Sequence, residues 1–354
     1  MRLAYVINSF EAGGAQYPVP RIVEGLRTHG IETTVYALSM RDGLAIKRLE
    51  AAGVDWVCAP YAKTAHIKAA RWLKKELERN PPDAIWTSLT QATLLGQRVG
   101  KRLKIPVISW QHNAFLKPIN RWLLRRQCRL SKFWVADSQS VLDFAVENIG
   151  LSPSDIRILP LYVANPSAPQ ATSVSDGMFR WVSVGRLHPN KNHAALIEAL
   201  APLKMRSDWS LEIAGDGAER AQLEDSIARF GLSAHITLKG HLENIPRFLA
   251  TAHGYVQPSR NEGLCIAAHE AMTAGLPCVV TATGQMPQTL YGSPAVVPIG
   301  DAAAVVSQMM AIMDDPALRQ HLATLSRDRV LLNFAPERFD EALADIATRL
   351  TAFV

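Results

Sequence analysis

Short runs of β-branched and other apolar residues alternate with longer helix-type patterns along almost the whole chain. This alternation is typical of βαβ units in a parallel sheet, so it predicts an α/β fold. In the first half we predict strands at residues 2–7, 33–38, 55–59, 84–88, 106–110 and 133–137. A second series is predicted at residues 179–184, 210–215, 235–240, 254–259 and 277–282. Two parallel sheets are therefore expected.

A stretch with two prolines and no apolar periodicity separates the two series, and we predict a linker there, at residues 165–177. It divides the chain into one domain at 1–164 and a second at 178–335. Two domains also suit a length of 354 residues, which exceeds what one hydrophobic core usually supports. Residues 336–354 have apolar positions at helical spacing, and we expect a terminal helix that crosses back toward the first domain.

The composition is that of a folded protein, with 48% hydrophobic and 20% charged residues. No apolar run approaches the roughly 20 residues that cross a bilayer, and the first residues lack the features of a signal peptide. We therefore expect a cytoplasmic protein. The four cysteines are scattered without a C-x-x-C pair, which argues against both a disulfide framework and a zinc site.

Charge is distributed unevenly between the two halves. Residues 1–164 carry a net charge of +10 and residues 165–354 a net charge of −4. The first half is therefore expected to meet an anionic partner, such as phospholipid, lipid phosphate or nucleic acid. No recognisable nucleic-acid-binding motif accompanies the basic residues, so we expect no nucleic acid partner.

The first predicted strand runs into a turn that contains Gly13 and Gly14. Two glycines allow a sharp turn and a close approach of the backbone to a ligand, and such a turn can present amides to a phosphate. The complete G-x-G-x-x-G and G-K-[ST] patterns are absent, so neither a dinucleotide-binding fingerprint nor a P-loop is predicted.

Two cations follow the first strand of the second domain, Arg186 and Lys191. Ligands of open parallel sheets bind beyond the carboxyl ends of the strands, which is where this loop lies. A guanidinium and an ammonium at this position could neutralise a pyrophosphate. A solvated basic loop is the alternative interpretation.

Two carboxylates, Glu262 and Glu270, follow the strand predicted at 254–259, and the second falls in a helical stretch. Carboxylates in such positions can accept hydrogen bonds from sugar and ribose hydroxyls. The alternative is a glutamate that caps the helix and another that is solvated on its face.

The order of these features resembles glycosyltransferase family 4. The resemblance is carried by Gly13-Gly14, Gly185-Arg186-Leu187 with Lys191, Gly215-Asp216-Gly217, Pro258-Ser259 and Glu262-x7-Glu270. It implies a GT-B fold, in which two Rossmann-like, doubly wound parallel-sheet domains face each other across a cleft. It also implies dependence on a nucleotide sugar, retention of the anomeric configuration, and no requirement for a metal or other cofactor.

The resemblance also implies roles for individual residues. Arg186 and Lys191 would hold the donor phosphates, and Glu270 the ribose. Glu262 would contact the transferred sugar beside Gly263 and Leu264. In the first domain, Gly14 of the Gly13-Gly14 turn would contribute an amide to the donor, and His112 matches the cleft histidine of the family. The resemblance thus implies Glu262 and His112 as the catalytic residues. Gln285 and Gln288 depart from the family pattern at the wall around the donor sugar, so the identity of the sugar is not implied.

A basic segment at 115–133 combines cations with aromatic and leucine residues. As a helix it would place a basic face beside an apolar one, which is typical of a helix on an anionic membrane. We hypothesise that it docks on the inner face of the plasma membrane and meets a lipid-linked acceptor. The alternative is an ordinary helix that packs its leucines on the sheet. The candidate membrane and acceptor residues are Lys117, Arg121, Trp122, Arg125, Arg126 and Arg129.

The predicted function is that of a hexosyltransferase that moves a sugar from a nucleoside diphosphate sugar to a lipid-linked acceptor or to a precursor of a cell-surface polysaccharide or glycolipid. Two alternatives stay open. One is a non-catalytic partner subunit that keeps the fold, to which the Gln285 and Gln288 replacements point. The other is a different enzyme on the same scaffold, such as a nucleotide-sugar epimerase.

Overall fold

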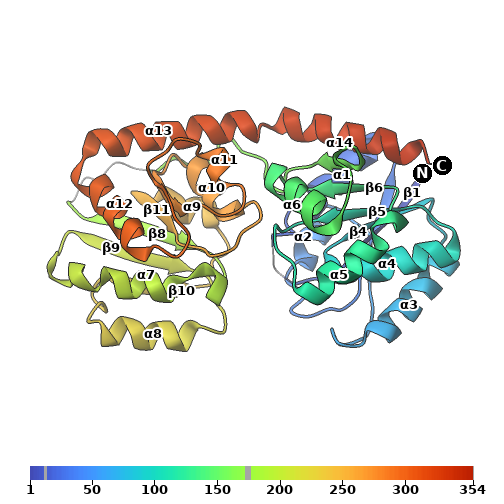
Figure 1. Cartoon of the computed structure of the whole chain (residues 1–354), viewed down its shortest axis with the longest axis horizontal. Coiled ribbons are helices and arrows are strands. Elements are labelled where there is room, and N and C mark those ends of the chain that lie inside the picture. The colour runs from blue at the N-terminus through green and yellow to red at the C-terminus, as the bar shows by residue number, and fades with distance from the viewer. Residues whose placement is uncertain (12–13, 172–176, 354) are drawn as a thin grey trace. The chain divides into compact units, whose positions relative to one another are not determined.

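The computed structural model describes residues 1–11, 14–171 and 177–353. Its contacts divide the chain into two compact units (Figure 1). The N-terminal unit consists of Met1–Tyr162 with Glu337–Val354, and the C-terminal unit of Val163–Pro336. None of the described helices is long and apolar enough to cross a bilayer. Each unit holds one sheet, and each is described here by itself.

The N-terminal unit contains a seven-stranded parallel sheet in the order β3-β2-β1-β4-β5-β6-β7. Its strands are β1 (Arg2–Ile7), β2 (Glu32–Ala37), β3 (Trp56–Cys58), β4 (Ala84–Ser88), β5 (Val107–Gln111), β6 (Phe133–Ala136) and β7 (Ile156–Ile158). Its helices are α1 (Val19–Thr28), α2 (Ile46–Ala51), α3 (His66–Arg79), α4 (Thr90–Leu103), α5 (Pro118–Gln127), α6 (Gln139–Ile149) and α14 (Pro336–Thr351).

Both faces of this sheet are covered, which is why its strands are nearly continuous apolar runs. The helices α3 and α4 pack their leucines and valines against β1, β4 and β5 on one face. The helices α5 and α6 extend this layer, with Leu124 and Val141 in one buried cluster with Trp134 of β6. Figure 1 shows α1 and α14 on the opposite face.

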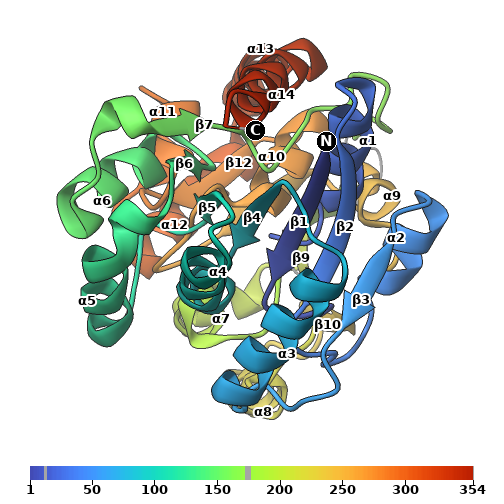
Figure 2. The ribbon, with the colours of Figure 1, turned by 90° about the vertical axis from the view of Figure 1, so that its right-hand side faces the viewer.

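The C-terminal helix α14 packs on α1 in the N-terminal unit. Gly25 of α1 lies directly against the Leu343 side chain of α14, so that any Cβ at position 25 would collide with it. Arg21 donates to Asp340 at 3.2 Å and lies over the ring of Phe339. Because α14 returns to this unit, the two chain termini lie side by side, as Figure 2 shows.

The C-terminal unit contains a six-stranded parallel sheet in the order β10-β9-β8-β11-β12-β13. Its strands are β8 (Phe179–Val184), β9 (Trp209–Ala214), β10 (Ile236–Gly240), β11 (Gly254–Gln257), β12 (Cys278–Thr281) and β13 (Val296–Val297). Its helices are α7 (His193–Leu200), α8 (Arg220–Arg229), α9 (Ile245–Ala250), α10 (Ile266–Thr273), α11 (Met286–Thr289), α12 (Ala302–Asp314) and α13 (Pro316–Asn333).

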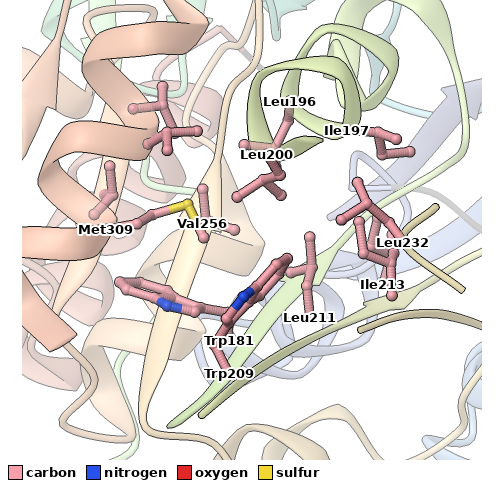
Figure 3. Close-up of a cluster of buried hydrophobic side chains, with 14 of the residues drawn as sticks. Trp181, Leu196, Ile197, Leu200, Trp209, Leu211, Ile213, Leu232, Val256 and Met309 are labelled. Carbon is pink, nitrogen blue, oxygen red and sulfur yellow. The ribbon is translucent and has the colours of Figure 1, made fainter. Parts of the chain in front are cut away.

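Two tryptophans anchor the core of the C-terminal unit. Trp181 of β8 and Trp209 of β9 are almost completely buried. Figure 3 shows them between Leu211 of β9 and Met309 of α12, with Leu200 of α7 nearby. The predicted alternation of strands and helices therefore closes around a second hydrophobic core.

The prediction of two parallel, Rossmann-like α/β sheets is confirmed. Counted from its own first strand, the C-terminal sheet has the order 3-2-1-4-5-6, and the N-terminal sheet has the same order with a seventh strand added at its edge. Eleven strands were predicted and each is present within a few residues, whereas β7 and β13 were not predicted. Those two strands have three and two residues, too few to show a period in the sequence. Of the predicted linker, residues 172–176 lie outside the described residues, and Ala171 donates to the carbonyl of Ala274.

Candidate functional site

The two loops that carry the predicted phosphate and sugar contacts follow neighbouring strands in the C-terminal unit. In this sheet β8 pairs in parallel with β11, although β9 and β10 lie between them in the chain. The order of the strands reverses at this pair, and ligands of open α/β sheets bind beyond the carboxyl ends of the strands at such a point. The β8–β11 pair therefore brings the loop 185–192 next to the loop 258–265.

Glycines hold the first of these loops against the end of β9. Gly185 donates to Ala214, and Leu187 donates to Asp216, each at 2.9 Å. Gly215 has a φ of 135°, and a Cβ there would collide with the backbone of Gly185. Only glycine allows this close approach of two backbones, which sets the course of the chain toward Arg186 and Lys191.

Lys191 and Glu262 form an ion pair at the edge of the sheet. The Lys191 Nζ donates to Glu262 Oε1 at 2.8 Å, and the two side chains are only 19% and 13% exposed. Burial lowers the pKa of Lys191, but the adjacent Glu262 carboxylate outweighs this, so the pKa is raised above its ordinary value. An ammonium has three N–H donors, so Lys191 can bind Glu262 and an anionic oxygen together.

Arg186 lies in the same loop and its side chain is exposed. Its positive charge acts on Lys191 and opposes the raised pKa of that ammonium. Both cations lie between β8 and α7. The structure therefore brings Arg186, Lys191 and Glu262 together at one edge of the C-terminal sheet.

Glu262, Gly263 and Leu264 precede α10, whose first residue is Ile266. Gly263 and Leu264 are buried, and Cys265 at the helix start has a φ of 62°, which is unusual for a residue other than glycine. Glu270 is half-buried inside α10. The helix thus begins four residues beyond Glu262, so Glu262 lies in the loop and Glu270 lies in the helix.

The residues that depart from the family pattern lie beyond β12, with Gln285 directly before α11 and Gln288 within that helix. Gln285 donates its backbone N–H to the carbonyl of Gly263 at 2.9 Å. A Cβ on Gly284 would collide with that same carbonyl, and its φ of 56° also suits glycine. The side-chain Oε1 of Gln285 is buried without a hydrogen-bond partner among the described residues, whereas Gln288 is exposed. Gln285 is therefore packed next to the Glu262 loop.

His112 lies in the N-terminal unit, directly after β5, with both ring nitrogens engaged. Its Nε2 lies 2.7 Å from the Ser88 hydroxyl, and its Nδ1 lies 3.0 Å from Asp137 Oδ1. The ring packs on Trp110 with a centroid distance of 4.7 Å and is almost fully buried. Because β4, β5 and β6 are neighbours, the ends of these strands bring Ser88, His112 and Asp137 together.

Asp137 is itself buried, with an exposure of 1%. Burial raises its pKa to about 6, and the charge of His112 and the hydrogen bond to it oppose that rise. A carboxylate on Nδ1 fixes which nitrogen of the imidazole carries the proton. Asp137 thus orients the His112 ring.

The remaining predicted residues of the N-terminal unit that the structure describes lie at its surface. Gly13 lies outside the described residues, and Gly14 is exposed, with its carbonyl accepting from the Tyr17 N–H. The six candidate membrane and acceptor residues are all exposed on or beside α5, whereas Leu124 of α5 is buried in the core. The exposed face therefore carries the cations together with aromatic residues, and the leucines do not form a separate apolar face.

Three hydroxyl and amide side chains to which the sequence analysis assigned no role form a hydrogen-bonded row that ends on Glu262. They are Tyr255, Gln257 and Ser259, which are buried and linked by hydrogen bonds. Ser88 and Asp137 were also missed as partners of His112. The signal that could have identified the first group is the spacing of two residues along one strand, which places all three side chains on the same face.

One hollow of about 380 Å³ lies away from these residues. It is at the amino ends of strands in the N-terminal unit, with Arg2, Glu32 and Asp55 in its lining. None of the predicted site residues lines it.

Two family models match the chain, and together they cover most of it. The model described as Glycosyltransferase Family 4 matches residues 12–163, and the model described as Glycosyl transferases group 1 matches residues 168–329. The chain belongs to glycosyltransferase family 4. The resemblance inferred from the sequence is thereby confirmed.

Curated relatives of this family 4 chain include two proteins of Rhizobium meliloti. The lipopolysaccharide core biosynthesis glycosyltransferase LpsD is 28% identical over 201 residues, which is 55% of this chain and 58% of the relative. The lipopolysaccharide core biosynthesis mannosyltransferase LpsB is 30% identical over 175 residues, which is 46% of this chain and 49% of the relative. The chain thus spans about half the length of these relatives.

Solved structures match the fold of the family 4 chain over almost its full length. The crystal structure of Anabaena Alr3699/HepE in complex with UDP-glucose has a TM-score of 0.84 and 18% identity, and covers 99% of this chain and 100% of that one. Sucrose-phosphate synthase from Thermosynechococcus elongatus has a TM-score of 0.83 and 17% identity, and covers 100% of both chains. These likenesses support the assignment of the fold.

Proposed function

We propose that this protein transfers a sugar from a nucleoside diphosphate sugar to an acceptor hydroxyl. The observation that carries the proposal is the ion pair between Lys191 and Glu262, with Arg186 in the same loop, at the carboxyl edge of the β8–β11 pair. It combines positive charge for a diphosphate with a carboxylate for hydroxyl groups. Membership in glycosyltransferase family 4 supports it, as does the likeness to a protein bound to UDP-glucose.

In the proposed reaction the bond between the anomeric carbon and the diphosphate oxygen breaks, and its electron pair stays on the diphosphate. Arg186 and Lys191 stabilise that departing negative charge, which is commonly the largest catalytic contribution. The acceptor oxygen bonds to the anomeric carbon on the same face, so the configuration is retained, and the acceptor proton passes to the diphosphate. No covalent enzyme intermediate and no metal ion is required, because the two cations supply the positive charge.

The other residues have binding roles in this proposal. Glu262 contacts the transferred sugar beside Gly263 and Leu264, and Glu270 accepts the ribose hydroxyls. In the N-terminal unit, Gly14 contributes its amide to the donor. The His112 ring is buried and forms a hydrogen bond at each of its two nitrogens. This supports a role in shaping the acceptor side of the reaction rather than in proton transfer.

For the acceptor we propose a lipid-linked saccharide that the enzyme meets at the cytoplasmic face of a membrane. Two relatives support this class by their names. An N-acetylgalactosaminyltransferase of Campylobacter jejuni, 24% identical, and a galactosyltransferase of Escherichia coli, 22% identical, are both named for diphospho-undecaprenol acceptors.

The membrane contact we propose is the exposed face of α5. Trp122 and Ile119 are 49% and 59% exposed, and the guanidinium of Arg126 lies 4.3 Å from the centroid of the Trp122 ring. An exposed aromatic residue among cations suits the headgroup region of an anionic bilayer. In flotation with phosphatidylglycerol vesicles at low salt we expect binding that is lost at high salt and in the Arg125→Glu/Arg126→Glu variant. Absence of binding at low salt would contradict this contact.

A donor screen tests the proposed reaction. UDP-, GDP- and ADP-sugars are compared for thermal stabilisation, because a ligand that binds only the native protein raises the melting temperature. Products are then analysed with and without acceptor lipid. We expect hydrolysis or transfer of the stabilising donor, and its loss in Glu262→Gln. Stabilisation without turnover would favour a non-catalytic subunit, and isomerisation of the donor without acceptor would favour an epimerase.

A further inference from the structure

Three polar side chains at alternate positions form a buried row beside Glu262. Tyr255 and Gln257 belong to β11, and Ser259 follows two residues beyond the strand end. Side chains two residues apart on a strand point to the same face, which explains how the three come to lie in a line. Their exposures are 0%, 1% and 0%, so each polar group needs a partner within the protein.

The row is connected by short hydrogen bonds. The Tyr255 hydroxyl donates to Gln257 Oε1 at 2.6 Å, and Gln257 Nε2 donates to Ser259 Oγ at 2.7 Å. The Ser259 hydroxyl then donates to Glu262 Oε1 at 2.7 Å. In addition, Thr281 of β12 donates to the Ser259 carbonyl at 2.5 Å, which holds the backbone of the row in place.

The chemistry of each group gives the row one direction. A tyrosine hydroxyl has one proton, and burial raises the pKa of Tyr255 well above its ordinary value, so the proton stays on the oxygen. That proton is donated to the Gln257 carbonyl oxygen, and the amide N–H₂ on the other side of the carboxamide faces Ser259. The single proton of Ser259 is left to point at Glu262. Every donor in the row points toward the carboxylate.

The two carboxylate oxygens of Glu262 differ in their hydrogen bonds. Oε1 accepts from both Ser259 and the Lys191 ammonium. Oε2 takes part in no hydrogen bond with the residues that the structure describes, and the side chain is 13% exposed. The carboxylate is thus held by one oxygen, and the other oxygen is left to accept a hydrogen bond from outside the protein.

We propose that Tyr255, Gln257 and Ser259 are positioning residues that fix Glu262 through Oε1, so that Oε2 accepts a hydroxyl of the donor's sugar ring. This inference rests on the proposed function, since it takes a nucleoside diphosphate sugar as the ligand. It distinguishes the sugar from the rest of the donor, because the row ends on the Glu262 carboxylate, which is assigned to the sugar, whereas Arg186 and Glu270 are assigned to the diphosphate and the ribose.

Calorimetric titration tests this separation. The full-length protein is titrated with UDP-glucose and UDP, with GDP-mannose and GDP, and with ADP-glucose and ADP. The pair that binds the wild type is then used for Ser259→Ala, Ser259→Thr and Tyr255→Phe. We expect Ser259→Ala to weaken binding of the nucleotide sugar about tenfold, since one charge-assisted hydrogen bond is lost, and to leave binding of the free diphosphate within about twofold. Tyr255→Phe should weaken binding of the nucleotide sugar about threefold, and Ser259→Thr should retain the wild-type affinity for it.

The matched control is Ser226→Ala. Ser226 is a buried serine of the same unit whose hydroxyl donates to the Gln222 carbonyl of its own helix. It should leave both affinities unchanged. Equal losses for the nucleotide sugar and the diphosphate in Ser259→Ala, or no loss for either, would overturn the positioning role. A wild-type protein that binds none of the six ligands would instead overturn the proposed function and, with it, the ligand of the row.

Discussion

The Lys191 ammonium and the Glu262 carboxylate lie 2.8 Å apart, although 71 residues separate them in the chain. Their side chains come from the loops after β8 and β11, which the sheet places next to each other. Both side chains are largely buried, so the hydrogen bond between them holds the two charges in fixed positions.

We expect Lys191→Ala to lower kcat/KM for the donor identified in the screen by about 100- to 1000-fold, the range for removing one preorganised donor. In Lys191→Ala/Glu262→Ala the loss should be much smaller than the product of the single losses, because the two groups act as a unit. Steady-state kinetics measure both. The control is Lys239→Ala, which breaks the Lys239–Glu212 pair of β10 and β9 outside the site. Losses that multiply independently would contradict the coupling.

The contact between His112 and Asp137 gives a second prediction. Asp137→Ala leaves the buried Nδ1–H without an acceptor, which costs about 1–3 kcal/mol of folding free energy. Asp137→Asn should cost less, because its carboxamide oxygen still accepts that hydrogen bond. Urea unfolding followed by tryptophan fluorescence provides the measurement. Asp143→Ala is the control, since Asp143 is exposed on α6. Equal stabilities for Asp137→Ala and Asp143→Ala would contradict the role of this contact.

Two buried histidines predict how the stability of the C-terminal unit depends on pH. Burial lowers the pKa of His193 to about 3 and that of His269 to about 4, from an ordinary value of 6.5. Between pH 6.5 and about 4, the two histidines are therefore protonated in the unfolded chain but remain neutral in the native unit. The stabilising contribution is complete above pH 6.5 and is lost as the pH falls through this window.

At pH 5 the loss should amount to about 2 kcal/mol for each histidine relative to pH 7, from the size of the shifts. Urea titrations at pH 7, 6 and 5 measure it, and His269→Gln should make the dependence shallower. His29→Gln, at an exposed position, should leave it unchanged. A wild-type protein whose unfolding free energy is constant from pH 7 to 5 would show that the prediction is wrong.

The docking of α14 on α1 gives the fourth prediction. Leu343 is 2% exposed and lies against Gly25. Its replacement by alanine should destabilise the N-terminal unit by about 2–5 kcal/mol, the usual range for a buried leucine, and lower its melting temperature by several degrees. Leu332→Ala is the matched control, because Leu332 of α13 is 65% exposed. Calorimetry that finds the same small change for both variants would argue against a docked helix.

Much of the fold could be predicted from the sequence because its signals are local. The runs at 2–7, 84–88 and 179–184 coincide with β1, β4 and β8, since a parallel strand that is covered on both faces is largely apolar. The strand predicted at 254–259 ends earlier, at Gln257, before Pro258, whose missing N–H cannot continue the ladder.

The candidate site could be predicted only in part. Arg186, Lys191 and Glu262 could be proposed from their side-chain chemistry and from their positions in loops after predicted strands. The pairing of Lys191 with Glu262 could not be predicted in this way. Ser88, His112 and Asp137 are 24 and 25 residues apart, and no local pattern relates them. They meet because three parallel strands end at the same edge of the sheet.

The sequence by itself determined which segments become strands and helices, because apolar period and turn residues act over a few positions. Only the tertiary structure decided which loops meet, since that depends on strand order and on parallel pairing across long intervals. The ion pair of Lys191 with Glu262 follows from the β8–β11 pairing, and the contact of Leu343 with Gly25 follows from the return of α14. Neither contact could be predicted from the residues that flank its two members in the sequence.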